Sequence, residues 1–271
     1  MTLKEEESLT VAEAFSRKSH VYDAFGEDHL NLSRMRQKVR HHALAHLRSG
    51  DRILELNAGT GTDAAYFAGL GFKVHATDLS PGMVAKIEQK ISNLGLEDRF
   101  SAQLCSFDSL EQLGSRSFDY VFSNLGGVNC AHDLSRITRG VEKLLPPGGR
   151  VTWVVMPPIC LWELAQVLRG DFSTALRRLH PHGTLARVEG MRFMTWYHPP
   201  RGVIKAFGKG FRPLQLQGLS VFTPPADHKS FPGHHPRLFS WLRWTEDLLA
   251  DRYPFNRWGD FYILTLEKYA E

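Results

Sequence analysis

The stretch from Ile53 to Gly71, ILELNAGTGTDAAYFAGLG, constrains the fold more than any other part of the chain. Its first four residues, ILEL, predict a short buried strand, and NAGTG predicts a tight turn. Apolar residues then recur at helical spacing up to Leu70. A strand that ends in glycines and passes straight into a helix leaves backbone N–H groups free to face a ligand. The stretch therefore predicts a nucleotide-like binding site.

Strands and helices alternate after this turn. A second strand is expected at 72–78, and the helix that follows opens with Ser80 as a cap and Pro81 in its first turn. Further strands are expected at 99–105, 118–123, 150–156, 211–221 and 260–267, and further helices at 133–145 and 201–208. Such alternation is typical of a parallel sheet covered by helices.

Two segments interrupt the alternation. We expect a helical cap at residues 1–48 and one α/β domain at 49–271, with insertions at 157–200 and 223–259. Ligands of open parallel sheets bind beyond the carboxyl ends of the strands, and both insertions follow strands that end there. The insertions are therefore expected to act as lids, with an apolar rim formed by Trp162, Trp196, Tyr197, Phe222 and Phe231.

The second insertion contains one clear amphipathic helix. Its apolar face collects Leu238, Trp241, Leu242, Thr245, Leu248 and Leu249. We expect this face to pack on the sheet domain, with a substrate lid or a dimer contact as the alternatives.

Composition narrows the class of protein. The net charge is +4, but the Lys and Arg residues are dispersed, so a nucleic-acid partner is not expected. Cys105, Cys130 and Cys160 form no CxxC pair, which suits a reducing compartment. The acidic start MTLKEEESLT does not resemble a signal peptide, and no apolar run is long enough to span a membrane. We expect a cytoplasmic protein, either a monomer or a homodimer.

An acidic residue marks the end of the second strand. In adjacent parallel strands Asp78 would lie beside the glycine turn, where its carboxylate could accept hydrogen bonds from the two hydroxyls of a ribose. A dinucleotide-dependent oxidoreductase would use the same device, so the turn and the acid alone leave the nucleotide open.

The residues around the turn narrow this choice. ELNAGTG closely resembles motif I of the class I S-adenosylmethionine (SAM) methyltransferases. TDLSPGMV, FDYVFSNLGGVN and VEKLLPPGGRVTWVV resemble later motifs of the same superfamily, so that the resemblance covers residues 53–156. FSNLGGVN followed by the aromatic insertion is similar to a bacterial group of small-molecule methyltransferases. The resemblance implies a Rossmann-like, seven-stranded, mostly parallel sheet with helices on both faces, SAM as the cofactor and S-adenosylhomocysteine (SAH) as its product.

The resemblance also implies which residues bind the cofactor. Those around the methionine moiety would be Tyr22, Glu55, Asn57, Ala58, Gly59, Thr60, Gly61 and Asn124. Asp78 would bind the ribose, and the adenine would lie near Leu79, Met83, Ser106 and Phe107.

Catalysis places few demands on the protein. Methyl transfer from a sulfonium mainly requires alignment of the nucleophile, and a general base is needed only when the acceptor must lose a proton. The candidates after the fourth strand are His132, Asn124 and Asn129, with His20, His29 and His198 as further possible bases. His228, His234 and His235 lie in a predicted loop and lack the regular spacing of metal ligands, so no metal is expected.

We therefore expect methyl transfer to a small or medium-sized, partly apolar acceptor, with O or N as the favoured nucleophile. A tRNA or rRNA methyltransferase is an alternative, although the chain lacks an NPPY-type motif and a basic run. A SAM-binding protein without catalysis is a second alternative, and an NAD-dependent oxidoreductase is the last.

Overall fold

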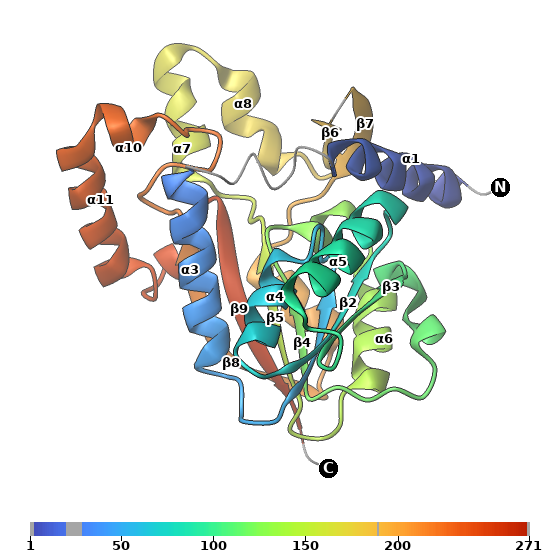
Figure 1. Ribbon diagram of the computed structural model, residues 1–271. Coiled ribbons are helices and arrows are strands. Elements are labelled where there is room, and N and C mark those ends of the chain that lie inside the picture. Colours follow the sequence, from blue (N-terminus) through green and yellow to red (C-terminus); the bar gives the residue numbers. More distant parts are fainter. Residues whose placement is uncertain (1–2, 20–28, 189, 270–271) are drawn as a thin grey trace.

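The computed structural model describes residues 3–19, 29–188 and 190–269, and its centre is a seven-stranded sheet (Figure 1). The strand order is β3-β2-β1-β4-β5-β9-β8. The bounds are β1 Arg52–Leu56, β2 Lys73–Asp78, β3 Phe100–Leu104, β4 Tyr120–Ser123, β5 Arg150–Val155, β8 Phe211–Leu219 and β9 Phe261–Lys268. Strands β1 to β5 pair in parallel, whereas β9 runs antiparallel to both β5 and β8. The predicted fold class is confirmed.

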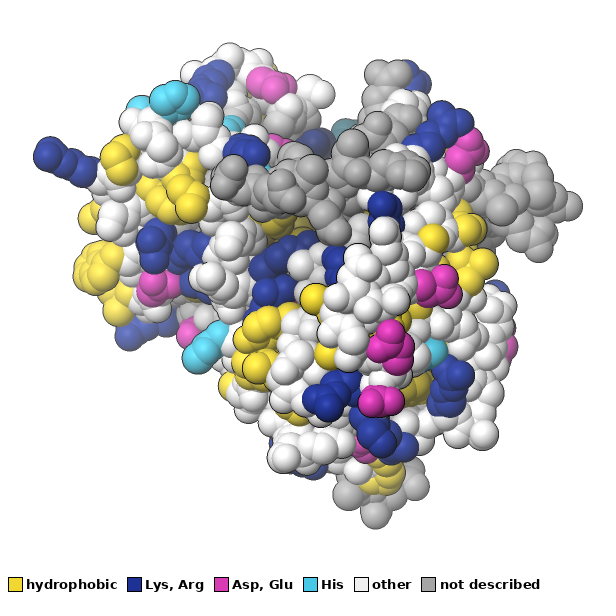
Figure 2. Space-filling view, in the orientation of Figure 1, with side chains coloured by type: hydrophobic (Ala, Val, Ile, Leu, Met, Phe, Trp, Pro, Cys, Tyr) yellow, Lys and Arg dark blue, Asp and Glu magenta, His cyan; other side chains and the backbone are white. Residues whose placement is uncertain are grey.

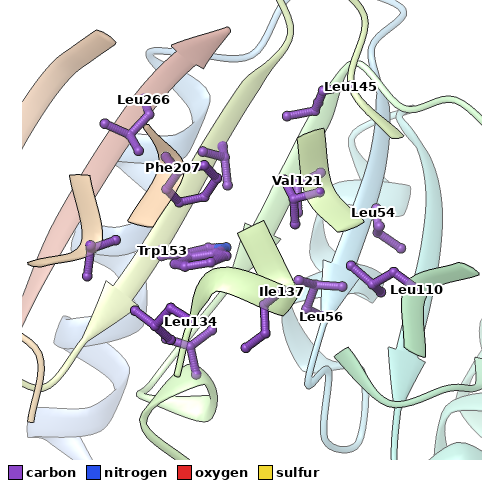
Figure 3. Packing of buried hydrophobic residues seen from close by; sticks show 14 of the residues in the cluster. Leu54, Leu56, Leu110, Val121, Leu134, Ile137, Leu145, Trp153, Phe207 and Leu266 are labelled. Atoms are coloured by element: carbon purple, nitrogen blue, oxygen red, sulfur yellow. The ribbon is translucent and has the colours of Figure 1, made fainter. Parts of the chain in front are cut away.

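Helices cover both faces of this sheet because its strands alternate buried side chains between them. On one face lie α3 (Leu30–Leu44), α4 (Thr62–Gly69) and α5 (Pro81–Leu94), which pack on residues such as Ile53 and Phe122. On the other face lie α6 (Ser135–Leu144) and α9 (Pro200–Phe207). There Trp153 contacts Phe207 with ring centroids 4.8 Å apart, and Ile137 and Val121 extend the same core (Figure 3).

The first insertion is folded as short helices and a hairpin. Its helical part consists of α7 (Leu161–Leu164) and α8 (Phe172–Leu176), separated by Gly170 at φ 78°, which ends the preceding turn. A two-stranded antiparallel hairpin, β6 (Thr184–Val188) and β7 (Met191–Thr195), completes it. The sequence interpretation missed this hairpin, since neither strand is long and the aromatic residues suggested only an irregular lid.

The second insertion ends in α11 (Pro236–Leu249), preceded by the short α10 (Phe231–His234). The buried side chains of α11 are Phe239 and Glu246. Four residues on another side are exposed by 48–62%: Leu238, Trp241, Trp244 and Leu248. Hydrophobic side chains accordingly gather on the surface over α10 and α11 (Figure 2). Of the packing face expected from the sequence, Leu238, Trp241 and Leu248 are exposed, and Leu242, Thr245 and Leu249 are half-buried. Buried hydrogen bonds from Ser220 and Thr223 to Glu246 hold another side of α11.

Helix α1 (Leu3–Lys18) lies beside the β6–β7 hairpin and the start of α5 (Figure 1). The Ser16 and Ser80 hydroxyls are 2.8 Å apart, and the rings of Phe15 and Phe193 are 5.8 Å apart. Helix α1 therefore bridges the strand-end loop after β2 and the first insertion. None of the helices that the structure describes is long and apolar enough to cross a membrane.

Candidate cofactor and acceptor site

A cavity of about 600 Å³ opens at the carboxyl ends of β1, β2 and β4. One half is lined by residues that follow these strands and β3: Asn57, Gly59, Asp78, Leu79, Ser106, Phe107, Asp108 and Asn124. The other half is mostly apolar and is lined by Val11, Phe15, Leu125, Gly126, Gly127, Cys130, Ala131, His132, Asp133, Met156, Ala186, Phe193, Met194, Thr195 and Trp196. The sheet edge, α1 and the hairpin therefore share one site, as topology predicts for an open parallel sheet.

The turn after β1 depends on left-handed backbone conformations. Asn57, Gly59 and Gly61 have φ values of 52°, 56° and 73°. Asn tolerates such values better than most residues, and the Asn57 amide also donates to the Ser123 hydroxyl at 3.1 Å. At Gly61 a Cβ would lie 3.0 Å from Ile87 Cγ1, so glycine is required for packing as well as for conformation.

Asp78 belongs to the polar half. Its carboxylate accepts hydrogen bonds from the backbone N–H groups of Gly59 and Ser80, each at 2.9 Å. Burial raises the pKa of Asp78 to about 6, although these backbone N–H groups oppose the shift. Each carboxylate oxygen can accept a further hydrogen bond from a ligand.

The other cofactor candidates divide into cavity residues and supporting residues. Leu79, Ser106, Phe107 and Asn124 join Asn57, Gly59 and Asp78 in the lining, whereas Ala58, Thr60, Gly61 and Met83 do not reach it. Met83 is fully buried beneath the site. Tyr22 lies outside the described residues, as does His20.

Glu55 is buried behind the glycine turn and does not line the cavity. Burial, followed by the charge of Asp63, raises the pKa of Glu55 well above its usual range. The Ala64 N–H donates to its carboxyl group, while Oε2 has no hydrogen-bond partner among the described residues. This arrangement favours a protonated Glu55 that lies behind the turn.

The two asparagines after β4 differ in their surroundings. Asn124 lines the cavity, and its Nδ2 donates to Asp63 Oδ2 at 2.8 Å. Asn129 is fully buried outside the lining. Its Nδ2 donates to the carbonyls of Met156 and Trp196, and its Oδ1 accepts from the Met156 N–H. Asn129 therefore joins the end of β5 to the end of the hairpin, and this geometry corrects its expected catalytic placement to a structural one.

Among the histidine candidates that the structure describes, only His132 lines the cavity. Its ring lies 5.6 Å from that of Trp196. His29 caps α3 by accepting from the Leu32 N–H, and its Nε2 lies 2.7 Å from the Ala226 carbonyl. His198 Nε2 lies 2.8 Å from the Ala131 carbonyl. His29 and His198 therefore contact backbone carbonyls, and neither of them lines the cavity.

The expected apolar rim is only partly present. Trp196 lines the cavity, but Trp162, Tyr197, Phe222 and Phe231 do not. Trp162 instead donates to the Phe222 carbonyl at 2.8 Å, and the ring centroids of Trp162 and Phe231 are 5.2 Å apart. These three aromatic residues join the two insertions to each other, away from the cavity.

A buried ionic cluster anchors the first insertion to β9. Among the described residues, Cys160, Glu163 and Asp260 form the one group that could hold a metal ion. However, Arg178 donates to Glu163 at 2.6 Å and to Asp260 at 2.7 Å. Its guanidinium therefore supplies the positive charge that pairs with these two carboxylates. Arg178 also lies over the Tyr197 ring, at 5.2 Å. The cluster is therefore an ion-pair network next to the hairpin.

Several lining residues were missed from the sequence. They come from α1 and from the hairpin, as Val11, Phe15, Ala186, Phe193, Met194 and Thr195, and from the strand-end loops, as Cys130, Asp108 and Asp133. The strand-end residues lie within a few positions of predicted site residues and could have been found from topology. No local signal identifies the α1 residues, because their contact with the site depends on tertiary packing.

Comparison with known proteins agrees with this geometry. Residues 53–149 match the family described as "Methyltransferase domain". The S-adenosyl-L-methionine-dependent Diels-Alderase iliD of Neonectria sp. (strain DH2) is 28% identical over 156 residues, covering 55% of this chain and 58% of that protein. Demethylmenaquinone methyltransferase of Beutenbergia cavernae is 30% identical over 122 residues, covering 45% of this chain and 47% of that one. The chain thus spans about half the length of these relatives.

A solved structure extends the comparison to the whole fold. The 1,6-didemethyltoxoflavin-N1-methyltransferase of Burkholderia thailandensis, with bound 1,6-didemethyltoxoflavin and SAH, matches with a TM-score of 0.61 and 19% identity. The match covers 100% of this chain and 92% of that one. The predicted resemblance is confirmed: residues 53–149 match a methyltransferase domain, and the chain has the Rossmann-like fold of the class I SAM-dependent methyltransferases.

Proposed function

We propose that this protein binds SAM in the polar half of the cavity and methylates a small, partly apolar acceptor held in the other half. The observation that carries the proposal is the continuity of one cavity from Asp78 to the apolar residues of the hairpin. The similarity of residues 53–149 to methyltransferase domains supports it. SAM, when bound, supplies an electrophilic methyl carbon attached to a sulfonium.

The charge of the cavity suits a cationic cofactor. Asp78, Asp108 and Asp133 contribute carboxylates to the described lining, which includes neither Lys nor Arg. Carboxylates attract a sulfonium and repel phosphates, since charge interactions are strong in partly desolvated sites. The lining therefore favours a neutral or cationic acceptor over RNA, which was the main alternative.

The acceptor half is suited to hold an apolar molecule next to the methyl group. Phe15, Phe193 and Met194 come from α1 and the hairpin, and Trp196 lies beside His132. Displacement forms a bond from the acceptor O or N to the methyl carbon while the carbon–sulfur bond breaks and releases SAH. An acceptor that must lose a proton can pass it to His132, the one histidine in the described lining.

The proposal is tested with SAM labelled in its methyl group. The protein is incubated with this SAM and a library of small phenols, amines and N-heterocycles, and extracts are examined for labelled product. We expect label in at least one apolar member of the library and none in total tRNA. Label in tRNA alone would contradict the proposal.

A SAM-dependent cyclisation is a second candidate. The relative iliD, which is named a SAM-dependent Diels-Alderase, favours it, as does the largely apolar acceptor half. The same labelling experiment distinguishes the two, because a cyclase would change its substrate without transferring label or changing its mass.

A further inference from the structure

Helix α3 is connected to the cavity wall through a chain of ionic contacts. Arg36 Nη1 on this helix contacts Asp63 Oδ2 at 2.5 Å, and Arg40 Nε contacts Asp63 Oδ1 at 2.7 Å. Arg40 also donates to the Thr62 carbonyl at 3.0 Å. Its guanidinium lies 4.2 Å from the centre of the Tyr66 ring. Two cations from α3 thus hold the first turn of α4, the helix that leaves the glycine turn.

Asp63 connects the two arginines to Asn124. The Asp63 carboxylate is 2% exposed, and its Oδ2 accepts from Asn124 Nδ2 at 2.8 Å. An ionised carboxylate can only accept hydrogen bonds, so it selects the NH2 side of the amide. Asn124 Oδ1 in turn accepts from the Leu125 N–H at 2.8 Å. The amide is therefore fixed at both ends.

The orientation of this amide matters because Asn124 lines the cavity. One N–H of its NH2 group is directed to Asp63, and the amide has a second N–H that can serve a ligand. The backbone beyond it is unusual, since Leu125 and Gly126 have φ values of 49° and 78°. A strained turn keeps its geometry only when its surroundings specify it.

We infer that Arg36 and Arg40 are positioning residues for the cofactor site: through Asp63 they hold the Asn124 amide in the orientation that contacts SAM. The inference rests on the proposed function, because it takes the cavity to bind SAM. On this inference, the predicted N-terminal cap contributes to cofactor binding, although α3 does not itself line the cavity. Charge-assisted hydrogen bonds of this kind are the strong ones in proteins, and rigid support around a site preserves its binding geometry.

A double-mutant cycle on Arg40 and Asn124 tests the inference, with SAH binding measured by calorimetry on the full chain. We expect Asn124→Ala to weaken SAH binding about tenfold, because it removes a hydrogen bond to the ligand. We expect Arg40→Met to weaken it about fivefold, because the Asn124 amide then loses part of its fixed orientation. The double variant should bind no more weakly than Asn124→Ala alone, because Arg40 acts through Asn124.

Arg34→Met is the matched control. Arg34 lies on the same helix, is 12% exposed against 19% for Arg40, and also pairs with acids, but these are Glu246 and Asp247 on α11. It should lower the thermal midpoint without weakening SAH binding. Asp63→Asn, which keeps the side-chain size, provides a second variant if Arg40→Met does not fold, and should weaken SAH binding at least fivefold.

The outcomes separate this inference from the function on which it rests. Wild-type affinity in folded Arg40→Met, additive effects in the double variant, or an equal loss in Arg34→Met would overturn the positioning inference while SAH binding by the wild type still stands. Failure of the wild-type protein to bind SAH would overturn both.

Discussion

The two insertions start at the same edge of the sheet but differ in what they reach. The first follows β5 and contributes to the cavity its hairpin, including Phe193, and Trp196, which follows the hairpin. The second follows β8, and none of its described residues lines the cavity. Sequence reasoning treated the two as equivalent lids because it considered only the direction of the strands.

The position of a strand within the sheet explains the difference. Strand β5 is next to β4, whereas β8 is the last strand of the order and lies three places from β4. Neighbouring strands are about 4.8 Å apart, so three spacings place the end of β8 about 14 Å from that of β4. An insertion at the end of β8 therefore starts well to the side of the cavity, whereas one after β5 starts next to it.

The second insertion packs on helix α3 instead. Asp247 contacts Arg34 at 3.1 Å and also Lys38, and Glu246 accepts hydrogen bonds from the Ser220 and Thr223 N–H groups. The comparison teaches that one insertion lines the cavity, while the other braces the helix from which Arg36 and Arg40 extend.

Replacement of one buried glutamate in each insertion should show this division most strongly. Glu246→Gln and Glu163→Gln each remove a charge that is paired with arginine, and each should lower the free energy of unfolding by about 3 kcal/mol. Only Glu163→Gln should also slow methyl transfer, because its partner Arg178 supports Tyr197 beside the hairpin. Thermal melts and turnover with a labelled methyl group measure the two effects. Equal loss of turnover in folded Glu246→Gln would contradict the division.

A matched pair of tryptophans should separate the insertions in catalysis. We expect Trp196→Ala to lower kcat/KM for the acceptor about 50-fold, since removal of a cavity wall costs both contacts and alignment. Trp241→Ala, on the exposed side of α11, should leave kcat/KM within about twofold of the wild-type value. Steady-state kinetics on any acceptor found in the library provide the measurement. A larger loss for Trp241→Ala would place α11 at the active site.

The polar half should respond to substitution in a different way from the hairpin. Asp78→Ala should weaken SAH binding by more than tenfold, because hydrogen bonds to a charged group are worth about 1.5–3 kcal/mol. Trp196→Ala should change SAH affinity much less. Calorimetric titration of both variants tests this, and unchanged affinity in Asp78→Ala would remove Asp78 from the cofactor site.

The pH response should be the smallest effect. The pKa of Asp78 is raised to about 6, so its carboxylate is charged above that pH and becomes protonated below it. SAH affinity should therefore fall a few-fold between pH 7 and pH 5.5, since a protonated carboxyl group is a weaker acceptor. Burial opposes ionisation of Asp247, but Lys38 and Arg34 outweigh it and hold the pKa of Asp247 below its usual value. The α3–α11 contact should consequently not change over this range. Constant SAH affinity would contradict the role given to Asp78.

The sequence was informative where local pattern and topology agree. The glycine turn, Ser80 with Pro81 and the strand alternation predicted β1 to β5, β8 and β9 to within a few residues. For β1, β2, β4 and β5 the reason is that buried parallel strands read as apolar runs bounded by turns. The β6–β7 hairpin was not predictable in the same way. Its exposed Leu185 and half-buried neighbours give no clean two-residue alternation.

The residues of the site were likewise predictable only where topology places them. Asp78, Asn57 and Asn124 could be placed in the cavity because strand ends converge in an open parallel sheet. The sequence did not show that Asn129 and Met83 are buried outside the cavity. In a helical turn, a shift of one or two positions changes whether a side chain points to the cavity or to the core. Arg36 and Arg40 reach the site through Asp63, and no motif marks such a tertiary contact.

Calorimetric titration of the wild-type protein with SAH and, separately, with NAD tests the central claim most directly. The account predicts one SAH site per chain with micromolar or tighter affinity, and no heat of binding with NAD. Tight binding of NAD without binding of SAH would contradict the assignment of the cavity to SAM.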